Sequence, residues 1–153
     1  MEKAALKEHR RHSTADKPFS YYISNIPEYF PNAPMHWHKE FELNVILEGE
    51  GDFVTGDIHF TAYKGDIVLT PPDMLHAVYQ HDDKRCVYDT LDLDGSMLGS
   101  RDNDRAADAF IAPLILGAYS IETHITPEHC YYSELLTLSL IHISEPTRRS
   151  WIS

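Results

Sequence analysis

The chain has 153 residues, 42% of them apolar, and a formal net charge of −11 at pH 7. This length and apolar share indicate one domain with its own core and exclude a disordered chain. No run approaches the roughly 20 apolar residues that a membrane-spanning helix needs, and the acidic excess argues against nucleic-acid binding, which requires clustered Lys and Arg.

The start of the chain, residues 1–18, is expected to form a solvated arm. It carries a basic cluster, Lys7 to His12, and lacks the apolar segment of a signal peptide. The two cysteines, Cys86 and Cys130, are too few and too far apart to predict a disulfide framework or a zinc cluster. We therefore expect a cytoplasmic protein with reduced thiols.

Short strands are predicted from Phe19 to Leu93. Aromatic, β-branched or alternating residues mark the stretches FSYYISNI, FELNVILEG, IVLT, HAVYQ and CVYDTLDL. The second stretch is expected to end at Gly49-Glu50-Gly51, and Thr55-Gly56-Asp57-Ile58 predicts a hairpin turn. About eight short strands without crossover helices indicate a mostly β fold, an antiparallel barrel or sandwich, over residues 19–95.

A helical region is predicted over residues 96–137. After a polar loop, Ala106, Phe110 and Leu114 share one helical face, Pro113 is expected to kink that helix, and Gly117 to end it. Thr126 as N-cap and Pro127 at the first helical position predict a second helix that begins near Pro127.

The end of the chain has a different origin in our interpretation. The segment Leu138 to Arg148, LSLIHISEPTR, is identical to a translation of a transposase-based sequencing adapter. We therefore expect residues 138–153 to be an artefact of assembly that truncates the encoded protein near Thr137. The alternative is a genuine helix extension, because Leu135, Leu138 and Ile141 have helical spacing.

The stretch HWHKEFE, residues 36–42, carries the strongest chemical signal. Residues two apart in a strand point the same way, so His36, His38 and Glu42 are predicted to share one face of an extended stretch. Two imidazoles and a carboxylate are a common ligand set for zinc, manganese, iron or nickel. His76, at the start of a later strand, is expected to complete the set inside a barrel.

Two spaced motifs resemble those of the cupin family. The first is His-x-His-x3-Glu-x6-Gly, at His36, His38, Glu42 and Gly49; the second is Gly-x5-Pro-x4-His, at Gly65, Pro71 and His76. The ligand positions match, while Phe30, Asp73 and Gln80 replace two glycines and an asparagine of the motifs. The resemblance implies a cupin-type antiparallel β-barrel, or jelly roll.

The region from His36 to Val78 is also similar to the amino-terminal effector domain of AraC-type transcription regulators. Pro-x-His-x-His before an aromatic-acidic strand and Gly-Asp-Ile-Val-Leu before a Pro-x-x-x-His turn carry this resemblance. Later stretches add to it, namely Met97 to Ser100, Asn103-Asp104-Arg105 and Phe110 to Leu114, so that it covers roughly Phe19 to Thr137.

The AraC resemblance implies a cupin that senses a small polar metabolite such as a sugar, with following helices that form a homodimer. In that family, DNA is bound by two carboxy-terminal helix-turn-helix units. Those units are absent from this sequence, so DNA contact is expected only through the missing domain, and no membrane partner is expected.

Two interpretations of His36, His38, Glu42 and His76 stay open. They hold a divalent metal, or they form a polar wall that hydrogen-bonds a ligand directly. Trp37 is expected to face away from the two histidines beside it, and either to stack on a ligand or to pack in the core. Glu40 is expected at a surface turn, and four further histidines are expected on the surface: His59, His81, His124 and His129.

We expect a sensing domain without catalytic residues rather than an enzyme. The alternative is a small metal-dependent cupin enzyme, an isomerase or dioxygenase. Its metal would use the same four residues and leave positions open for substrate.

Overall fold

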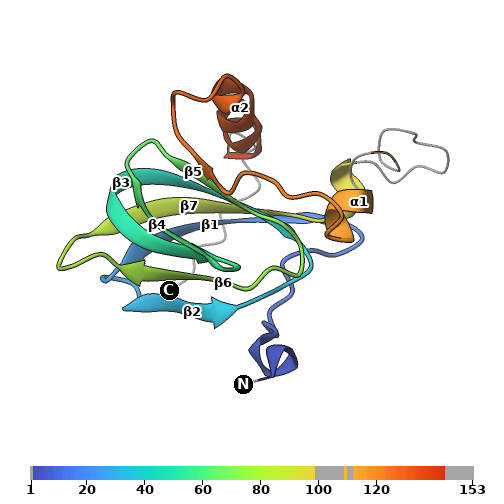
Figure 1. Ribbon diagram of the computed structural model, residues 1–153, viewed down its shortest axis with the longest axis horizontal. Coiled ribbons are helices and arrows are strands. Elements are labelled where there is room, and N and C mark those ends of the chain that lie inside the picture. Colours follow the sequence, from blue (N-terminus) through green and yellow to red (C-terminus); the bar gives the residue numbers. More distant parts are fainter. Residues whose placement is uncertain (1, 99–108, 110–111, 144–153) are drawn as a thin grey trace.

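The mostly β, antiparallel architecture that the strand patterns predict is confirmed (Figure 1). The computed structural model describes residues 2–98, 109 and 112–143. Its elements, in chain order, are η1 (Lys3–Leu6), β1 (Phe19–Ile26), β2 (Asn32–His36), β3 (Phe41–Thr55), β4 (Ile58–Tyr63), β5 (Ile67–Thr70), β6 (His76–Gln80), β7 (Cys86–Leu93), η2 (Gly95–Leu98), α1 (Ala112–Ile115), β8 (His124–Ile125) and α2 (Tyr132–Ile143).

The longest strand, β3, belongs to two sheets. Its first part pairs with β7 and β5, and its second part, from Glu50 to Thr55, pairs with β4 and β6. One sheet therefore has the order β1-β7-β3-β5-β8 and the other the order β2-β6-β3-β4, with antiparallel pairing between all these strands. The prediction that this strand ends at Gly49-Glu50-Gly51 is wrong, because the chain bends there and its pairing continues.

Gly49 explains why the chain can bend without ending the strand. Its φ is +74°, in the left-handed region that favours glycine. A Cβ atom on Gly49 would collide with the carbonyl oxygen of Arg85, so the backbones of β3 and the start of β7 approach closely. The predicted hairpin is confirmed, since Thr55 pairs with Ile58 across a turn in which Gly56 has a φ of +62°.

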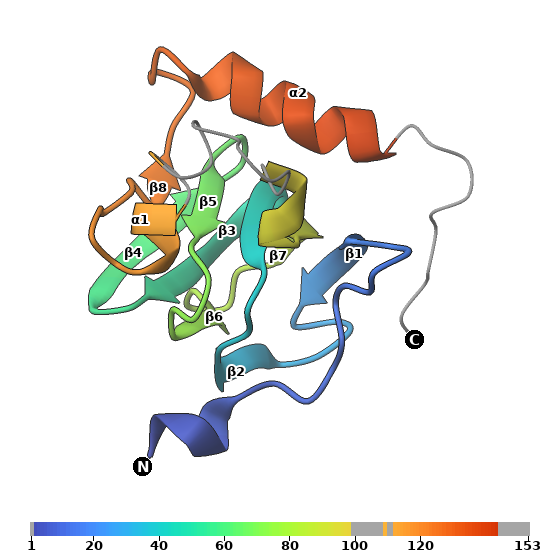
Figure 2. The same ribbon diagram turned by 90° about the vertical axis from the view of Figure 1, so that its right-hand side faces the viewer.

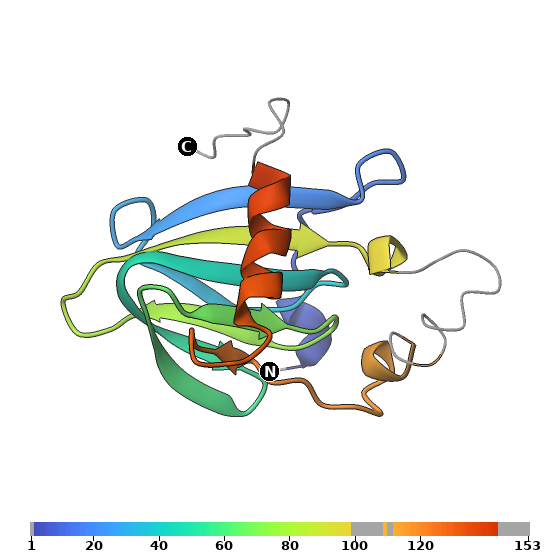
Figure 3. The ribbon, with the colours of Figure 1, turned by 90° about the horizontal axis from the view of Figure 1, so that it is seen from above.

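Helix α2 covers the outer face of the first sheet, lying across its strands (Figure 3). Leu135 and Leu136 of α2 pack against a buried cluster that includes Leu43 and Val45 of β3. A second outer cluster, formed by Phe19, Phe41, Leu91 and Leu93, contacts Leu138. The alternation of β3 thus places its odd-numbered residues from Phe41 to Val45 under the helix and the even-numbered ones inside the barrel.

The inside of the barrel has an apolar end, where side chains of both sheets meet. Its buried members are Ile26, Ile46, Phe53, Ala62, Val68, Val78, Cys86 and Tyr88. Cys86 is fully buried, as expected of a small hydrophobic residue rather than a nucleophile.

The C-terminal region differs from its prediction in two ways. Helix α2 begins at Tyr132 rather than near Pro127, because His129 closes a turn in which the Thr126 N–H donates to Nδ1 of His129 at 3.0 Å. The short strand β8 pairs with β5, so the expected helical region also contributes to a sheet. Helix α2 ends at Ile143, so it runs into the adapter-like segment as expected.

The first predicted helix is only partly within the described residues. Its α1 turn, Ala112–Ile115, is followed by Gly117 with a φ of +73°, as expected of a helix stop. The proposed helix start at Asn103-Asp104-Arg105, together with Ala106, Phe110 and Ile111, lies outside the described residues, as do Gly99, Ser100 and residues 144–153.

Candidate metal and ligand site

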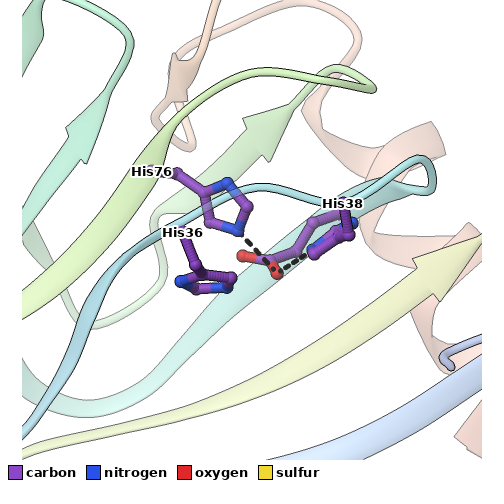
Figure 4. Close-up of side chains that lie close together, drawn as sticks. His36, His38 and His76 are labelled. Atoms are coloured by element: carbon purple, nitrogen blue, oxygen red, sulfur yellow. Dashed lines mark hydrogen bonds and ion pairs between the residues drawn. The ribbon is translucent and has the colours of Figure 1, made fainter. Parts of the chain in front are cut away.

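The four predicted ligand residues come together at one end of the barrel. His36 ends β2, His38 follows it in a loop, Glu42 is the second residue of β3, and His76 opens β6. His36, His38 and Glu42 do not share one extended stretch as predicted, because β2 and the first part of β3 belong to different sheets. The loop between them, rather than strand alternation, turns the side chains toward one another (Figure 4).

The Glu42 carboxylate lies between the His38 and His76 imidazoles. Its Oε2 is 3.2 Å from Nε2 of His38 and 3.3 Å from Nε2 of His76. One potential ligand atom from each of the four residues lies within 4.8 Å of all the others. Adjacent ligand atoms of a tetrahedral zinc site with Zn–N bonds near 2.05 Å are about 3.3 Å apart, so only small movements would be needed to hold an ion.

The outward-facing ring nitrogens of these histidines have partners that orient them. Nδ1 of His36 lies 2.7 Å from the carbonyl oxygen of Pro34, and Nδ1 of His76 lies 2.8 Å from that of Met74. A carbonyl only accepts, so both Nδ1 atoms donate, and each Nε2 is directed inward. Such outer partners are typical of metal-ligating histidines.

Glu40 lies on the outer side of His38, contrary to its expected place at a surface turn. Oε2 of Glu40 is 3.5 Å from Nδ1 of His38, which is an ion-pair distance, and this nitrogen forms no hydrogen bond within the described residues. Glu40 is itself buried, and its Oε1 accepts a hydrogen bond of 2.6 Å from the Ser13 hydroxyl. The N-terminal segment therefore covers this carboxylate.

The charges of the cluster are arranged to accept a cation. Burial raises the pKa of Glu42, but the His76 and His38 imidazoles outweigh burial and hold this pKa well below its usual value. Burial lowers the pKa of His76, but the Glu42 carboxylate more than compensates, and the net shift is upward. Burial and the neighbouring His76 lower the pKa of His36. A divalent ion bound at the inward nitrogens would replace the positive charge on His76 and keep Glu42 ionised.

A cavity of about 390 Å³ opens beside this cluster. Its polar wall includes His36, Glu42, His76, Thr90 and Asp92, and its aromatic wall includes Tyr22, Tyr29, Phe30 and Tyr88. The N-terminal segment contributes Glu8, Arg10 and His12 to the same lining. The cavity therefore offers hydrogen-bonding groups, apolar ring faces and a charged rim to a small guest.

Trp37 takes neither of its expected positions. It is half-buried and does not line the cavity. Its indole N–H donates to the carbonyl oxygen of Lys3 at 2.7 Å, and the ammonium groups of Lys3 and Lys7 lie 5.3 and 5.4 Å from its ring centroid. Trp37 thus contacts the N-terminal segment, whose η1 turn lies near β2 in Figure 2.

The sequence interpretation missed a second charged group, centred on His12. Its Nε2 is 2.6 Å from Oε2 of Glu8 and its Nδ1 is 2.7 Å from Oδ2 of Asp92. Burial lowers the pKa of His12, but the two carboxylates reverse this effect and raise it to about 11. The expectation of a solvated Lys7–His12 cluster is therefore wrong for His12, which is 7% exposed.

The sequence carried a signal for Asp92 of this group but none for His12. Asp92 could have been found, because it alternates with Tyr88 and Thr90 on the inward face of β7. Nothing in the sequence indicated that His12 enters the barrel.

The four histidines expected on the surface do not behave alike. His59 is exposed, as expected. His81 and His124 are only partly exposed, and each lies 2.8 Å from a carboxylate oxygen, of Asp52 and Asp66 respectively. His129 closes the turn before α2.

Residues 20–101 match the family model of the AraC-like ligand binding domain. An uncharacterized HTH-type transcriptional regulator of Bacillus subtilis (strain 168), YdeC, is 27% identical to the chain over 89 residues. The match covers 58% of this chain but 31% of that protein, so the chain spans about a third of its relative.

Solved structures with similar folds include a cupin protein from Bacteroides fragilis and a Cupin 2 conserved barrel domain protein from Salinispora arenicola. The first has a TM-score of 0.47 at 19% identity over 60% of this chain and 75% of its own. The second has a TM-score of 0.44 at 19% identity over 59% of this chain and 75% of its own. No helix among the described residues is long and apolar enough to cross a membrane. The match over residues 20–101 covers more than half of the chain, and it confirms the resemblance read from the motifs: the chain belongs to the AraC-like ligand-binding domain family, the amino-terminal cupin domain of AraC-type regulators.

Proposed function

We propose that this chain senses a small polar metabolite, such as a sugar or a related compound, for an AraC-type transcription regulator. The observation that carries the proposal is the cavity beside His36, Glu42 and His76 in a chain of this ligand-binding family. Polar groups on one wall suit hydroxyls, and aromatic rings on the other suit the apolar face of a sugar ring.

Each segment of the chain has a proposed role. Residues 1–18 form the arm, residues 19–95 the sensing barrel and residues 96–137 the dimerisation region, while residues 138–153 are adapter-derived. DNA binding belongs to helix-turn-helix units outside this sequence, in keeping with the net charge of −11.

Effector binding would act through a population shift. Because Glu8, Arg10 and His12 line the cavity together with barrel residues, a guest that touches both binds most tightly when the N-terminal segment is docked. A ligand moves a conformational equilibrium only by its difference in affinity for the two states. The effector would therefore select the state in which residues 1–18 are docked on the barrel.

We further propose that His36, His38, Glu42 and His76 hold a divalent metal. The inward Nε2 atoms, the carbonyl partners of His36 and His76 and the anionic Glu42 beside them support this assignment. When bound, such an ion would offer a Lewis-acidic position to an effector hydroxyl or carboxylate. The residues of the chain would orient that group and exclude water from it.

A binding screen tests the sensing proposal. Metal-loaded protein is screened by thermal shift against sugars, polyols and hydroxy acids, and each hit is measured by calorimetry. Ala33, half-buried in the cavity wall, is then changed to Phe to fill the space. We expect Ala33→Phe to abolish the shift while metal binding is retained; an effector that binds the variant as well as the wild type contradicts this cavity as the site.

The homodimer is proposed to form through the C-terminal region. Leu116 is 82% exposed there, and an apolar groove beside α2 is lined by Leu69, Ile121, Ile125 and Leu135. Sedimentation equilibrium of the wild type and of Leu116→Arg tests this assignment, which predicts a weaker dimer in the variant. A monomeric wild type would contradict dimerisation by this chain.

A metal-dependent isomerase or dioxygenase is the second candidate function. The specific observation in its favour is that His36, Glu42 and His76 face the cavity, where substrate could reach a bound ion. Elemental analysis after expression in metal-replete medium tests this candidate, and less than about a tenth of an ion per chain removes it.

A further inference from the structure

A second set of potential metal ligands lies next to the first. Glu8, His12 and His38 each offer one ligand atom within 4.8 Å of the other two. Glu8 and His12 come from the N-terminal segment, whereas His38 follows β2. His38 lies between the two sets, with its ring centroid 4.9 Å from that of His12 and 4.9 Å from that of His76.

The surroundings of His12 match those of a metal-ligating histidine. Its Nε2 faces Oε2 of Glu8 at 2.6 Å, and its opposite nitrogen, Nδ1, faces Oδ2 of Asp92 at 2.7 Å. A carboxylate behind an imidazole orients the ring and increases the basicity of the nitrogen that binds the ion. Asp92 is 1% exposed, so this outer partner is held inside the barrel.

The charge of this group also favours a cation. Two carboxylates, Glu8 and Asp92, flank one imidazole, and Nε2 of His38 is 3.9 Å from Oδ1 of Asp92. Within the described residues, both oxygens of Asp92 lack a well-formed hydrogen bond despite their burial. A divalent ion between Glu8, His12 and His38 would offset this concentration of negative charge.

We propose that Glu8, His12 and His38 form a second divalent-metal position, through which an ion ties the N-terminal segment to the barrel. The inward nitrogen of His38 can bind only one ion, so the two positions compete for it. A metal at the barrel position leaves the segment free of the ion, and a metal at the second position fixes residues 8–12. The inference concerns the same cavity as the proposed function, but it requires no effector.

Trypsin provides a direct probe, because Arg10 and Arg11 are exposed and lie between Glu8 and His12. The double variant His36→Gln/His76→Gln removes the two histidines that belong only to the barrel set and leaves the second set intact. Zn²⁺ alone, at about ten times its measured Kd, is expected to slow cleavage after Arg10 and Arg11 roughly tenfold in this variant. Cleavage after the exposed Lys84, in another loop, serves as the internal reference for any effect of zinc on trypsin.

Matched variants of the segment complete the test. Adding Glu8→Gln to the double variant is expected to abolish the protection by zinc, whereas adding His9→Gln, at an exposed neighbouring imidazole, is expected to preserve it. The inference is overturned if the double variant binds no zinc, or if Glu8→Gln and His9→Gln give equal protection. If the double variant does not fold by circular dichroism, the Glu8→Gln and His9→Gln comparison is made in the single variant His76→Gln, which also lacks the complete barrel set, with the same expected order.

The two proposals fail in different ways. Zinc binding by the wild type but not by the double variant would refute the second position and leave the barrel position standing. Absence of zinc from both proteins would refute both metal positions, while the effector screen would still test the sensing function.

Discussion

The two ends of the barrel interior are built on the same strands but carry opposite chemistry. Along the inward face of β3, Glu42 at the mouth gives way to Ile46 at the closed end; along β7, Asp92 gives way to Tyr88. The closed end buries apolar side chains, which stabilises the fold. The mouth buries charged groups, which costs stability unless they are paired. A binding site is thus added at one end of a core that the other end stabilises.

The largest effect should come from the closed end. Ile46 is 1% exposed in the apolar cluster, and Ile46→Ala is expected to lower the free energy of unfolding by about 2–5 kcal/mol. Ile58→Ala, at a residue 49% exposed, should cost less than about 1 kcal/mol and serves as the control. Chemical denaturation measures both, and equal losses would show that the closed end does not carry the stability.

At the mouth, the effect should appear in metal binding instead. Glu42→Gln removes the anionic group between His38 and His76, and zinc affinity is expected to fall about a hundredfold, or about 2.7 kcal/mol. The metal-free variant should lose less stability than Ile46→Ala, because His76 can release its proton. Calorimetric titration with zinc measures the affinity, and an unchanged Kd would contradict the role given to Glu42.

Asp89 sharpens the comparison because it is also a buried carboxylate. Among the described residues it forms no ion pair with a histidine. Burial raises its pKa to about 6, whereas the pKa of Glu42 is lowered. The folded state therefore binds the Asp89 proton more tightly than the unfolded state, and this contribution to stability falls as the pH rises from about 4 to 6.

Asp89→Asn should remove that pH dependence and stabilise the protein at pH 7 by about 2 kcal/mol. Denaturation of both proteins from pH 4 to pH 7 measures the difference. A variant that is less stable than the wild type at pH 7, or a difference that does not change with pH, would contradict the stated environment of Asp89.

The smallest effect is expected at Glu40, which lies on the outer side of the candidate ligand His38. Glu40→Gln weakens the partner of Nδ1 of His38, and zinc affinity should fall about tenfold. The neighbouring exposed residue provides the control, since Lys39→Gln should leave the affinity unchanged. A larger loss in Lys39→Gln than in Glu40→Gln would remove Glu40 from the site.

Local patterns predicted much of this fold. Most strands lie where alternating or β-branched residues indicated them, and the glycine at Gly56 marks its hairpin. The continuation of β3 through Gly49 was missed, because a glycine with positive φ permits either a turn or a bend. Pairing with β4 and β6 decides between them, and such pairing depends on residues far along the chain.

The candidate site was predictable to a similar extent. Motif spacing identified the candidate ligand residues that the structure brings together, although His36 and His38 converge with Glu42 through a loop between two sheets rather than along one strand. The surface assignments of Glu40 and His12 were wrong. Both residues are buried by contacts between the N-terminal segment and the barrel, namely Ser13 with Glu40 and His12 with Asp92. No local pattern encodes a contact between segments so far apart in the sequence.

The proposed binding of a divalent ion by Glu42 and the imidazoles at the mouth is tested most directly at His38. His38 belongs to both proposed ligand sets, so His38→Gln should weaken zinc binding at least about a hundredfold in equilibrium dialysis, while the exposed His59→Gln should not. At a free zinc concentration of about ten times the wild-type Kd, we expect about one zinc ion per chain for the wild type and for His59→Gln, and less than about a tenth for His38→Gln. A wild type that binds no zinc, or a His38→Gln variant that binds as much as the wild type, would contradict this proposal.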